Sequence, residues 1–202
     1  MDYLRWGVLG ASKFALEHLT PAIQLAKNNS FKALASTSKV KAAAFIELEP
    51  EIELFEDYNQ LLADDRIEAV YIPLPNTMHV DWTIRAIKSG KHVLCEKPIA
   101  MRAKEINELI KLRDDTGLLV AEAYMIVHHP QWQKAKEIVQ SGILGDLIQV
   151  DSVFSYNNQA DLENIRNNSK MGGGGLPDIG VYTLGSVRFS QVRNPWQFSM
   201  LI

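Results

Sequence analysis

The stretch His92-Val93-Leu94-Cys95-Glu96-Lys97-Pro98-Ile99-Ala100 combines an apolar run with a charged end. The apolar run predicts a buried strand, and Gly90 before it is typical of a helix end. Glu96, Lys97 and the proline then stand at the carboxyl end of that strand, where open α/β sheets bind ligands. A lysine partly shielded from water there can share or donate a proton. A surface Glu-Lys pair that caps a strand explains this stretch equally well.

Composition limits the classes of protein that this chain can belong to. Its 202 residues are 47% hydrophobic, enough for a sizeable core in one large domain or slightly more. A formal net charge of −3 without a basic run argues against a nucleic-acid partner. One cysteine excludes an internal disulfide. Neither a signal-peptide pattern nor a membrane-spanning stretch is present, so we expect a cytoplasmic protein without a membrane partner.

The first strand and its turn form a candidate phosphate-binding segment. An apolar run over residues 4–9 leads into Gly10-Ala11-Ser12-Lys13-Phe14-Ala15 and then a helical pattern. A glycine turn between strand and helix is the setting in which helix amides bind a pyrophosphate. The G-x-G-x-x-G pattern is incomplete, because Ser12 occupies the second glycine position while Ala15 fits the third. A plain strand–helix turn explains the pattern about as well.

The second predicted strand, residues 31–36, bears on the choice of cofactor. An NAD-binding fold usually has Asp or Glu at this strand end, where it binds the ribose 2′-hydroxyl. Here Ser36-Thr37-Ser38-Lys39 follows, so hydroxyls and an ammonium without a carboxylate favour a 2′-phosphate. The same cluster can cap a short helix over residues 39–45, and both roles are compatible.

Strand and helix patterns alternate up to about residue 123. Residues 69–72 and 118–122 predict strands, residues 57–63, 79–89 and 102–116 predict helices, and the acidic segment 47–56 predicts a loop. Asn76 is a natural cap for the helix that begins at His79, and His79 is either a core histidine or a contact of cofactor or substrate. This rhythm predicts a doubly wound parallel sheet.

The composition changes from Tyr124 onward. The pair His128-His129 precedes an amphipathic helix over residues 131–141, and without a nearby Cys or His partner the pair predicts no metal site. Residues 147–156 alternate as a long antiparallel strand would, residues 157–170 predict a loop, and residues 196–202 predict another strand.

Four glycines, residues 172–175, stand directly before a predicted helix that carries Asp178 and Tyr182. Their spacing of four places both side chains on one face of the helix. A carboxylate beside a phenol is a proton-handling pair, in which the phenol bonds the reacting oxygen. The alternatives are a flexible glycine linker and a buried tyrosine bonded to a capping aspartate.

Together these landmarks resemble the glucose–fructose oxidoreductase/inositol dehydrogenase (Gfo/Idh/MocA) family, in particular its dimeric dihydrodiol dehydrogenase and D-xylose dehydrogenase branch. The Glu-Lys-Pro landmark behind a Pro-Asn-x-x-His segment is its specific part. The resemblance rests on residues 7–12, 69–79, 90–98, 122–125 and 172–182.

The resemblance implies an α/β fold, with a Rossmann doubly wound parallel sheet over residues 1–123 that binds NADP or NAD. It implies an α+β domain with antiparallel strands over residues 124–202, which we expect to be incomplete because the chain is truncated relative to the family. The implied activity is NADP-preferring hydride transfer at a hydroxyl carbon of a sugar, polyol or cyclic diol. An inactive nucleotide-binding remnant or a partner-binding Rossmann module is the alternative. Uncovered apolar strands favour a homo-oligomer through the carboxy-terminal sheet.

The resemblance also implies residue roles. Lys97 matches the active-site lysine that contacts substrate and nicotinamide ribose, and Asp178 matches the acid that orients the substrate. Tyr182 stands where this branch has a tyrosine and inositol-type members have a histidine. The cofactor-binding residues that we expect are Gly10, Ala11, Ser12, Lys13, Phe14, Ser36, Thr37, Lys39, Pro73, Leu74, Asn76, His79, Glu96 and Lys97.

Overall fold

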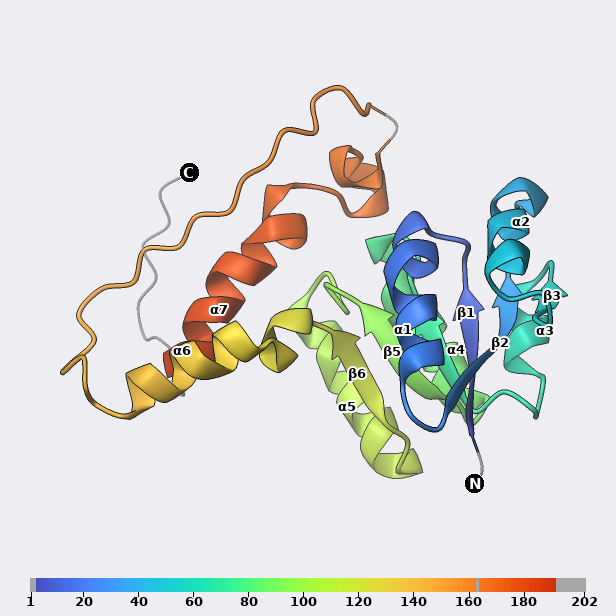
Figure 1. Cartoon of the computed structure of the whole chain (residues 1–202), viewed down its shortest axis with the longest axis horizontal. Coiled ribbons are helices and arrows are strands. Elements are labelled where there is room, and N and C mark those ends of the chain that lie inside the picture. Colours follow the sequence, from blue (N-terminus) through green and yellow to red (C-terminus); the bar gives the residue numbers. More distant parts are fainter. Residues whose placement is uncertain (1–2, 163, 192–202) are drawn as a thin grey trace. The chain divides into compact units, whose positions relative to one another are not determined.

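The computed structural model describes residues 3–162 and 164–191. The chain forms two compact units that divide after Ala123 (Figure 1).

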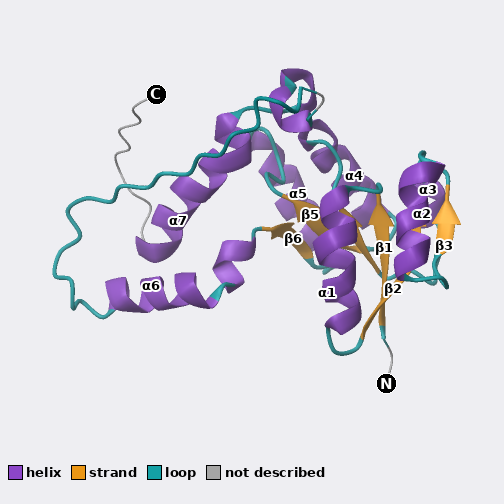
Figure 2. Cartoon of the chain, turned by 45° about the horizontal axis from the view of Figure 1, so that its top comes forward, coloured by secondary structure: helices purple, strands orange, loops and turns teal. Residues whose placement is uncertain are grey.

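The first unit is built on a six-stranded, wholly parallel sheet in the order β3-β2-β1-β4-β5-β6. Figure 2 shows the strands of this sheet in orange. This order is that of the Rossmann dinucleotide-binding fold, and it reverses between β1 and β4. The predicted doubly wound sheet is therefore confirmed. The strands are β1 Leu4–Leu9, β2 Asn29–Ala35, β3 Glu53–Phe55, β4 Ala69–Ile72, β5 His92–Glu96 and β6 Val120–Ala123.

Helices connect these strands, and several of them begin or end at the expected residues. Asp57 caps α3 by accepting a hydrogen bond from the Asn59 amide, and Gly117 ends α5 at a φ of 70°. A π-helical turn, Ala15–Leu19, precedes α1. The helices are α1 Thr20–Leu25, α2 Lys39–Leu48, α3 Tyr58–Leu62, α4 His79–Lys88 and α5 Ala103–Thr116.

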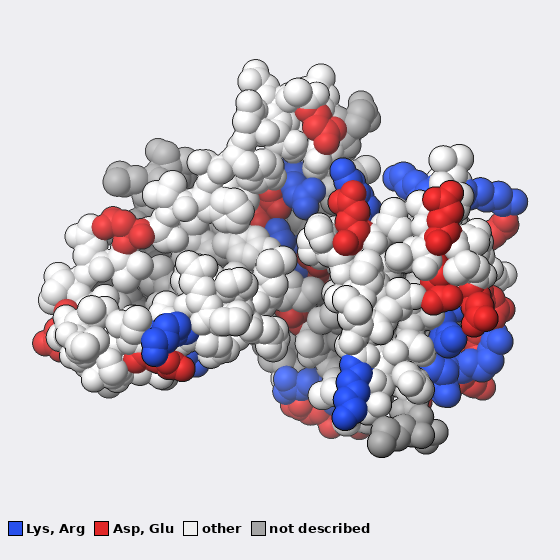
Figure 3. Space-filling view, in the orientation of Figure 1, with Lys and Arg blue, Asp and Glu red and all other residues white. Residues whose placement is uncertain are grey.

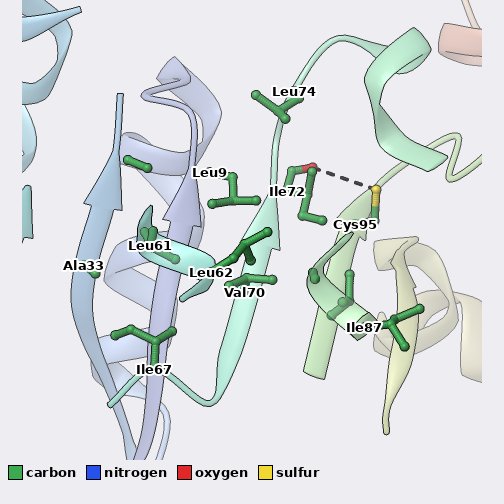
Figure 4. Close-up of a cluster of buried hydrophobic side chains, with 13 residues drawn as sticks. Leu9, Ala33, Leu61, Leu62, Ile67, Val70, Ile72, Leu74, Ile87 and Cys95 are labelled. Atoms are coloured by element: carbon green, nitrogen blue, oxygen red, sulfur yellow. Dashed lines mark hydrogen bonds between the residues drawn. The ribbon is translucent and has the colours of Figure 1, made fainter. Parts of the chain in front are cut away.

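Side chains alternate between the two faces of each strand, so apolar side chains lie on both faces of the sheet, and helices cover both. On β4, Val70 and Ile72 point into a cluster with α3 and α4, whereas Tyr71 points into a cluster with α1 and α2. Figure 4 shows the first cluster, in which the Cys95 thiol lies 4.0 Å from the carbonyl oxygen of Ile72. Both clusters are fully buried at their centres, so the sheet is a rigid platform for its strand ends.

The acidic segment over residues 47–56 was predicted to be a loop, and this is wrong in part. Helix α2 continues to Leu48, and residues 53–55 form the edge strand β3, which pairs with β2 from Ala33↔Glu53 to Ala35↔Phe55. Three residues are too few to show an alternating pattern. The strand is decided by hydrogen bonds to β2 and not by its own composition.

The second unit contains two main helices, α6 Pro130–Gln140 and α7 Val181–Gln191, which pack against each other (Figure 1). The His129 side chain caps α6 by accepting a hydrogen bond from the Gln131 amide at 3.2 Å. Its other regular structure consists of short helical turns, which are 3₁₀ turns at Met125–His128, Ile165–Asn167 and Ser169–Met171 and a π-helical turn at Leu176–Gly180.

Residues 147–156 were predicted to form an antiparallel strand, and in this structure they have no regular secondary structure. A strand needs a neighbouring segment for its backbone hydrogen bonds, and the described part of the second unit offers none. Ile148 and Val153 are accordingly 90% exposed. The strand predicted over residues 196–202 lies outside the described residues.

Charged side chains of both signs lie beside one another on the face of the first unit drawn in Figure 3, so no basic patch forms there. Within the described ranges, no helix combines the length and apolar character needed to cross a membrane.

Candidate cofactor-binding and active site

Four of the predicted segments end up along one edge of the first unit. Gly10 follows β1, Ser36 follows β2, Pro73 follows β4, and Lys97 follows β5. Because every strand is parallel, these carboxyl ends share one edge of the sheet. Ligands of open α/β sheets bind at this edge, beside the point where the strand order reverses.

The turn after β1 has the shape that a dinucleotide pyrophosphate requires. Gly10 has a φ of 102°, and a Cβ atom there would lie 2.8 Å from Leu74 Cδ2, so only glycine fits. Ser12 caps the following helix, since its Oγ accepts a hydrogen bond from the Ala15 amide at 3.0 Å. The amides of Lys13 and Phe14, in the first turn, have no carbonyl one helical turn earlier to bond. The turn and helix start therefore fit a phosphate group.

The segment after β2 forms the predicted helix cap. Ser38 Oγ accepts a hydrogen bond from the Lys41 amide, and Ser36 Oγ accepts one from the Ser38 amide. Thr37 is exposed. The expectation that no carboxylate stands here is wrong, because Glu56 Oε1 lies 3.2 Å from Lys39 Nζ. Both side chains are largely exposed, so the pair is weak and Lys39 can turn to another anion.

The segment after β4 carries Asn76 and His79, two residues predicted to contact the cofactor. Asn76 begins a 3₁₀ turn, and Met78 occupies the position before α4, so the predicted Asn76 cap of α4 is wrong. A turn inserted between Asn76 and α4 removes the cap geometry. His79 is fully buried, with Nδ1 2.8 Å from the Pro98 carbonyl oxygen and Nε2 2.7 Å from that of Leu74. The segment is thus anchored from inside the core.

The charged end of β5 is held by neighbouring strands. The Tyr71 hydroxyl of β4 donates to Glu96 Oε1 at 2.6 Å, and Glu96 Oε2 accepts from the Lys97 amide at 3.2 Å. Glu122 of β6 accepts a hydrogen bond from the Ile99 amide at 2.8 Å. Sequence reasoning missed Tyr71 and Glu122. A phenol inside an otherwise apolar buried strand was the available signal for Tyr71.

In the second unit, Asp178 forms the centre of a polar cluster. Arg166 Nε donates to Asp178 Oδ1 at 3.0 Å, and the Tyr156 hydroxyl donates to Asp178 Oδ2. Burial and the hydrogen bond with Asp178 raise the pKa of Tyr156. Neither Arg166 nor Tyr156 was found by sequence reasoning, since both are distant from Asp178 along the chain. Tyr156 therefore supplies a phenol that bonds the Asp178 carboxylate.

Tyr182 lies in the first turn of α7, after the π-helical turn that carries Asp178. Its ring stacks on Tyr124 at 5.6 Å between centroids and contacts Phe154 at 5.5 Å. The Tyr124 hydroxyl donates to the Val181 carbonyl at 2.8 Å. These aromatic contacts fix the ring of Tyr182 within its own unit.

The glycine run is a packed element, which argues against a flexible linker. A Cβ atom on Gly173 would lie 2.4 Å from the Ile165 carbonyl oxygen, and the Gly174 amide donates to the Arg166 carbonyl at 2.9 Å. This close approach brings Arg166 to Asp178. A polar pocket of about 320 Å³ opens beside them, lined by Tyr156, Asn157, Asn158, Gln159, Arg166, Asn167, Gly174, Gly175, Asp178 and Ile179. Among the described residues, no three His, Cys, Asp or Glu side chains cluster to hold a metal.

A family model described as "Oxidoreductase family, NAD-binding Rossmann fold" matches residues 4–124. The chain belongs to the Gfo/Idh/MocA oxidoreductase family. The model of that family's C-terminal domain matches residues 132–192. The family predicted from the sequence landmarks is therefore confirmed.

The names of two relatives in this family give a sugar or a sugar nucleotide as the substrate. The chain is 38% identical to a dTDP-3,4-didehydro-2,6-dideoxy-alpha-D-glucose 3-reductase from Streptomyces violaceoruber, over 90% of this chain and 52% of the relative. It is 35% identical to a D-xylose 1-dehydrogenase (NADP(+)) from Haloferax volcanii, over 92% of this chain and 56% of the relative.

A solved family structure has the same fold. It is a 3-ketoreductase from Actinomadura kijaniata in complex with NADP, with a TM-score of 0.80 and 30% identity over 93% of this chain and 55% of that one. The chain thus spans about half the length of these relatives.

Proposed function

We propose that the protein is an NADP-preferring oxidoreductase of sugars, sugar derivatives or cyclic diols. The observation that carries the proposal is the carboxyl edge of the parallel sheet, where the Gly10 turn and Lys97 stand on either side of the strand-order reversal. When bound, the dinucleotide would supply the hydride donor or acceptor. NADP is favoured because Ser36, Thr37 and Lys39 follow β2 and because the named relatives include an NADP-dependent dehydrogenase.

The chain's own residues would bind and orient the two reactants. Gly10, Ala11 and the first-turn amides at Lys13 and Phe14 would hold the pyrophosphate. Pro73, Leu74 and Asn76 would border the nicotinamide side. The Ser12 hydroxyl can donate a hydrogen bond to phosphate while it accepts one from the Ala15 amide.

Lys97 and Tyr182 are the proposed carriers of the substrate hydroxyl proton. In oxidation, the neutral amine or the phenolate would accept that proton as hydride leaves the carbon. In reduction, the ammonium or the phenol would donate it and stabilise the negative charge that develops on the oxygen as hydride arrives. Asp178, held by Arg166 and Tyr156, would accept hydrogen bonds from further substrate hydroxyls. A polar pocket lined by amide side chains next to Asp178 suits a polyhydroxyl substrate.

The test is a titration of NADPH and NADH by cofactor fluorescence, run beside a spectrophotometric assay for NADPH formation with a panel of aldoses, polyols and cyclic diols. Tighter binding of NADPH together with turnover of a panel member is the expected result. Binding without turnover of any panel member would instead indicate a nucleotide-binding module. Absence of binding would overturn the proposal.

We also propose that the chain associates with a second copy of itself through residues 147–156. Support comes from the exposure of Ile148 and Val153 on an extended segment whose backbone has no strand partner within the described part of its unit. Sedimentation over a range of protein concentrations tests this. Replacing Ile148 and Val153 with serine should shift the distribution toward monomer, and an unchanged distribution would contradict it.

A further inference from the structure

His79 is a buried polar side chain to which the proposed function gives no task. It is the first residue of α4 and is fully buried. Its ring lies between two segments that follow neighbouring strands, with Nδ1 2.8 Å from the Pro98 carbonyl oxygen and Nε2 2.7 Å from that of Leu74. Both ring nitrogens therefore face backbone carbonyl groups of the protein.

The two carbonyl groups belong to two segments at the carboxyl edge of the sheet, one beside Lys97 and one beside the Gly10 turn. Pro98 follows Lys97 directly. Leu74 is buried against the Gly10 turn, where its Cδ2 would lie 2.8 Å from an added Cβ. A single imidazole thus links the backbone next to the lysine with the residue that packs on the phosphate turn.

Two further bonds hold residues at the end of β5 and after it. Tyr71 holds the Glu96 side chain, and Glu122 holds the Ile99 amide. Neither bond reaches the segment after β4. The His79 ring is the contact among these that joins the two segments.

We propose that His79 is a positioning residue that fixes the Lys97–Pro98 segment and the Leu74 segment at one spacing, without contacting the cofactor. The proposal rests on the proposed oxidoreductase function for its kinetic consequence, although its structural part stands alone. A carbonyl oxygen only accepts hydrogen bonds, so each bond needs an N–H of the ring; a neutral imidazole donates one of the two, and donating both requires a proton on each ring nitrogen. Loss of the Pro98 contact would release the lysine, and loss of the Leu74 contact would release the wall of the phosphate turn.

Two conservative variants separate these contacts. The amide nitrogen of asparagine can replace Nδ1, so His79→Asn retains a donor toward Pro98 and loses the one toward Leu74. The amide nitrogen of glutamine can replace Nε2, so His79→Gln retains the donor toward Leu74 and loses the one toward Pro98. Both variants have a polar side chain of similar volume, and each retains one donor.

The expected kinetic result is a split between the two variants. His79→Gln should lose ~10²-fold in kcat, because small misplacement of a reacting group has that cost, while its KM for NADPH stays near that of the wild type. His79→Asn should retain most of kcat and raise the KM for NADPH. Equal losses of kcat in two folded variants would overturn the proposal, since a merely structural histidine does not distinguish its two nitrogens.

Hydrogen exchange provides a test that does not depend on turnover. Deuterium uptake should rise over residues 96–101 in His79→Gln and over residues 73–78 in His79→Asn, in each case with the other segment unchanged. The same uptake in both variants overturns the positioning role even if the enzyme has no measurable activity. Conversely, a clear exchange split without NADPH binding leaves the positioning role intact and refutes the proposed function.

The wild-type chain supplies a measurement in case neither variant folds. Nitrogen-15 NMR of the His79 ring should show a ring N–H proton protected from exchange with water. A ring proton that exchanges as fast as that of an exposed histidine would overturn the proposal.

Discussion

The two units hold their candidate residues in different ways. In the first unit, Lys97 follows a strand with partners on both sides. Buried Tyr71 bonds the side chain of Glu96 before it, and buried His79 contacts the carbonyl of Pro98 after it. In the second unit, Asp178 lies on a short turn and is held by Arg166 and by Tyr156, which is 49% exposed. The comparison shows that a complete sheet fixes its strand ends through the core, whereas the turn depends on a few partly solvated contacts.

The largest expected effect concerns Lys97, at the carboxyl edge of the sheet in the first unit. Lys97→Met should lower kcat by ~10²–10⁴-fold, because the ammonium that handles the proton is lost, while NADP affinity stays nearly unchanged. The matched control is Lys104→Met, since Lys104 is an exposed lysine on α5. Steady-state kinetics and a fluorescence titration measure both quantities. An unchanged kcat in Lys97→Met would remove Lys97 from the active site.

The corresponding change in the second unit is Tyr182→Phe. It keeps the ring that stacks on Tyr124 and contacts Phe154 and removes only the hydroxyl. If the proton passes through Tyr182, kcat should fall by ~10²-fold or more with little change in KM. A normal kcat in Tyr182→Phe together with a low one in Lys97→Met would assign proton transfer to the first unit alone.

Core substitutions test the difference in packing between the units. Leu34→Ala removes a fully buried side chain of the first unit and should lower the free energy of unfolding by about 2–5 kcal/mol. Ile148→Ala removes a side chain that is 90% exposed, so the change should stay within about 0.5 kcal/mol. Urea unfolding followed by tryptophan fluorescence and circular dichroism gives both values. A large loss in Ile148→Ala would show that residues 147–156 are packed.

The preference for NADP over NAD tests the exposed Lys39–Glu56 pair of the first unit. Lys39→Ala should reduce the preference for NADP over NAD by roughly tenfold to hundredfold, which is the worth of one charge-assisted phosphate contact. Glu56→Gln should act in the opposite direction, because it removes the carboxylate that competes for Lys39. Paired titrations with NADPH and NADH measure the ratio. An identical ratio in all three proteins would place 2′-phosphate recognition elsewhere.

The last prediction concerns the glycine run of the second unit. Gly173→Ala places a Cβ atom against the backbone oxygens of Ile165 and Arg166, so the free energy of unfolding should fall by about 1–3 kcal/mol and the Arg166–Asp178 contact should loosen. Gly175→Ala is the control, because Gly175 has a helical φ of −59° and open space around its Cα. Hydrogen exchange over residues 164–178 should rise only in Gly173→Ala. Equal exchange in both variants would mean that the run is not packed.

The sequence by itself determined the parallel sheet of the first unit and its family. Short apolar runs such as residues 69–72 are fully buried strands, and Gly117 ends its helix, because hydrophobic periodicity and backbone freedom act over a few residues. The Glu-Lys-Pro landmark identified the family for the same reason, since its residues are adjacent in the chain.

Tertiary structure decided the features that need a distant partner. Strand β3 exists because β2 offers it hydrogen bonds, and residues 147–156 are not a strand because the described part of their unit offers none. The contact of Glu56 with Lys39 and the two carbonyl contacts of His79 join segments that are separate in the sequence. A local pattern indicates which residues can be buried or hydrogen-bonded, but only the folded chain brings their partners within contact distance.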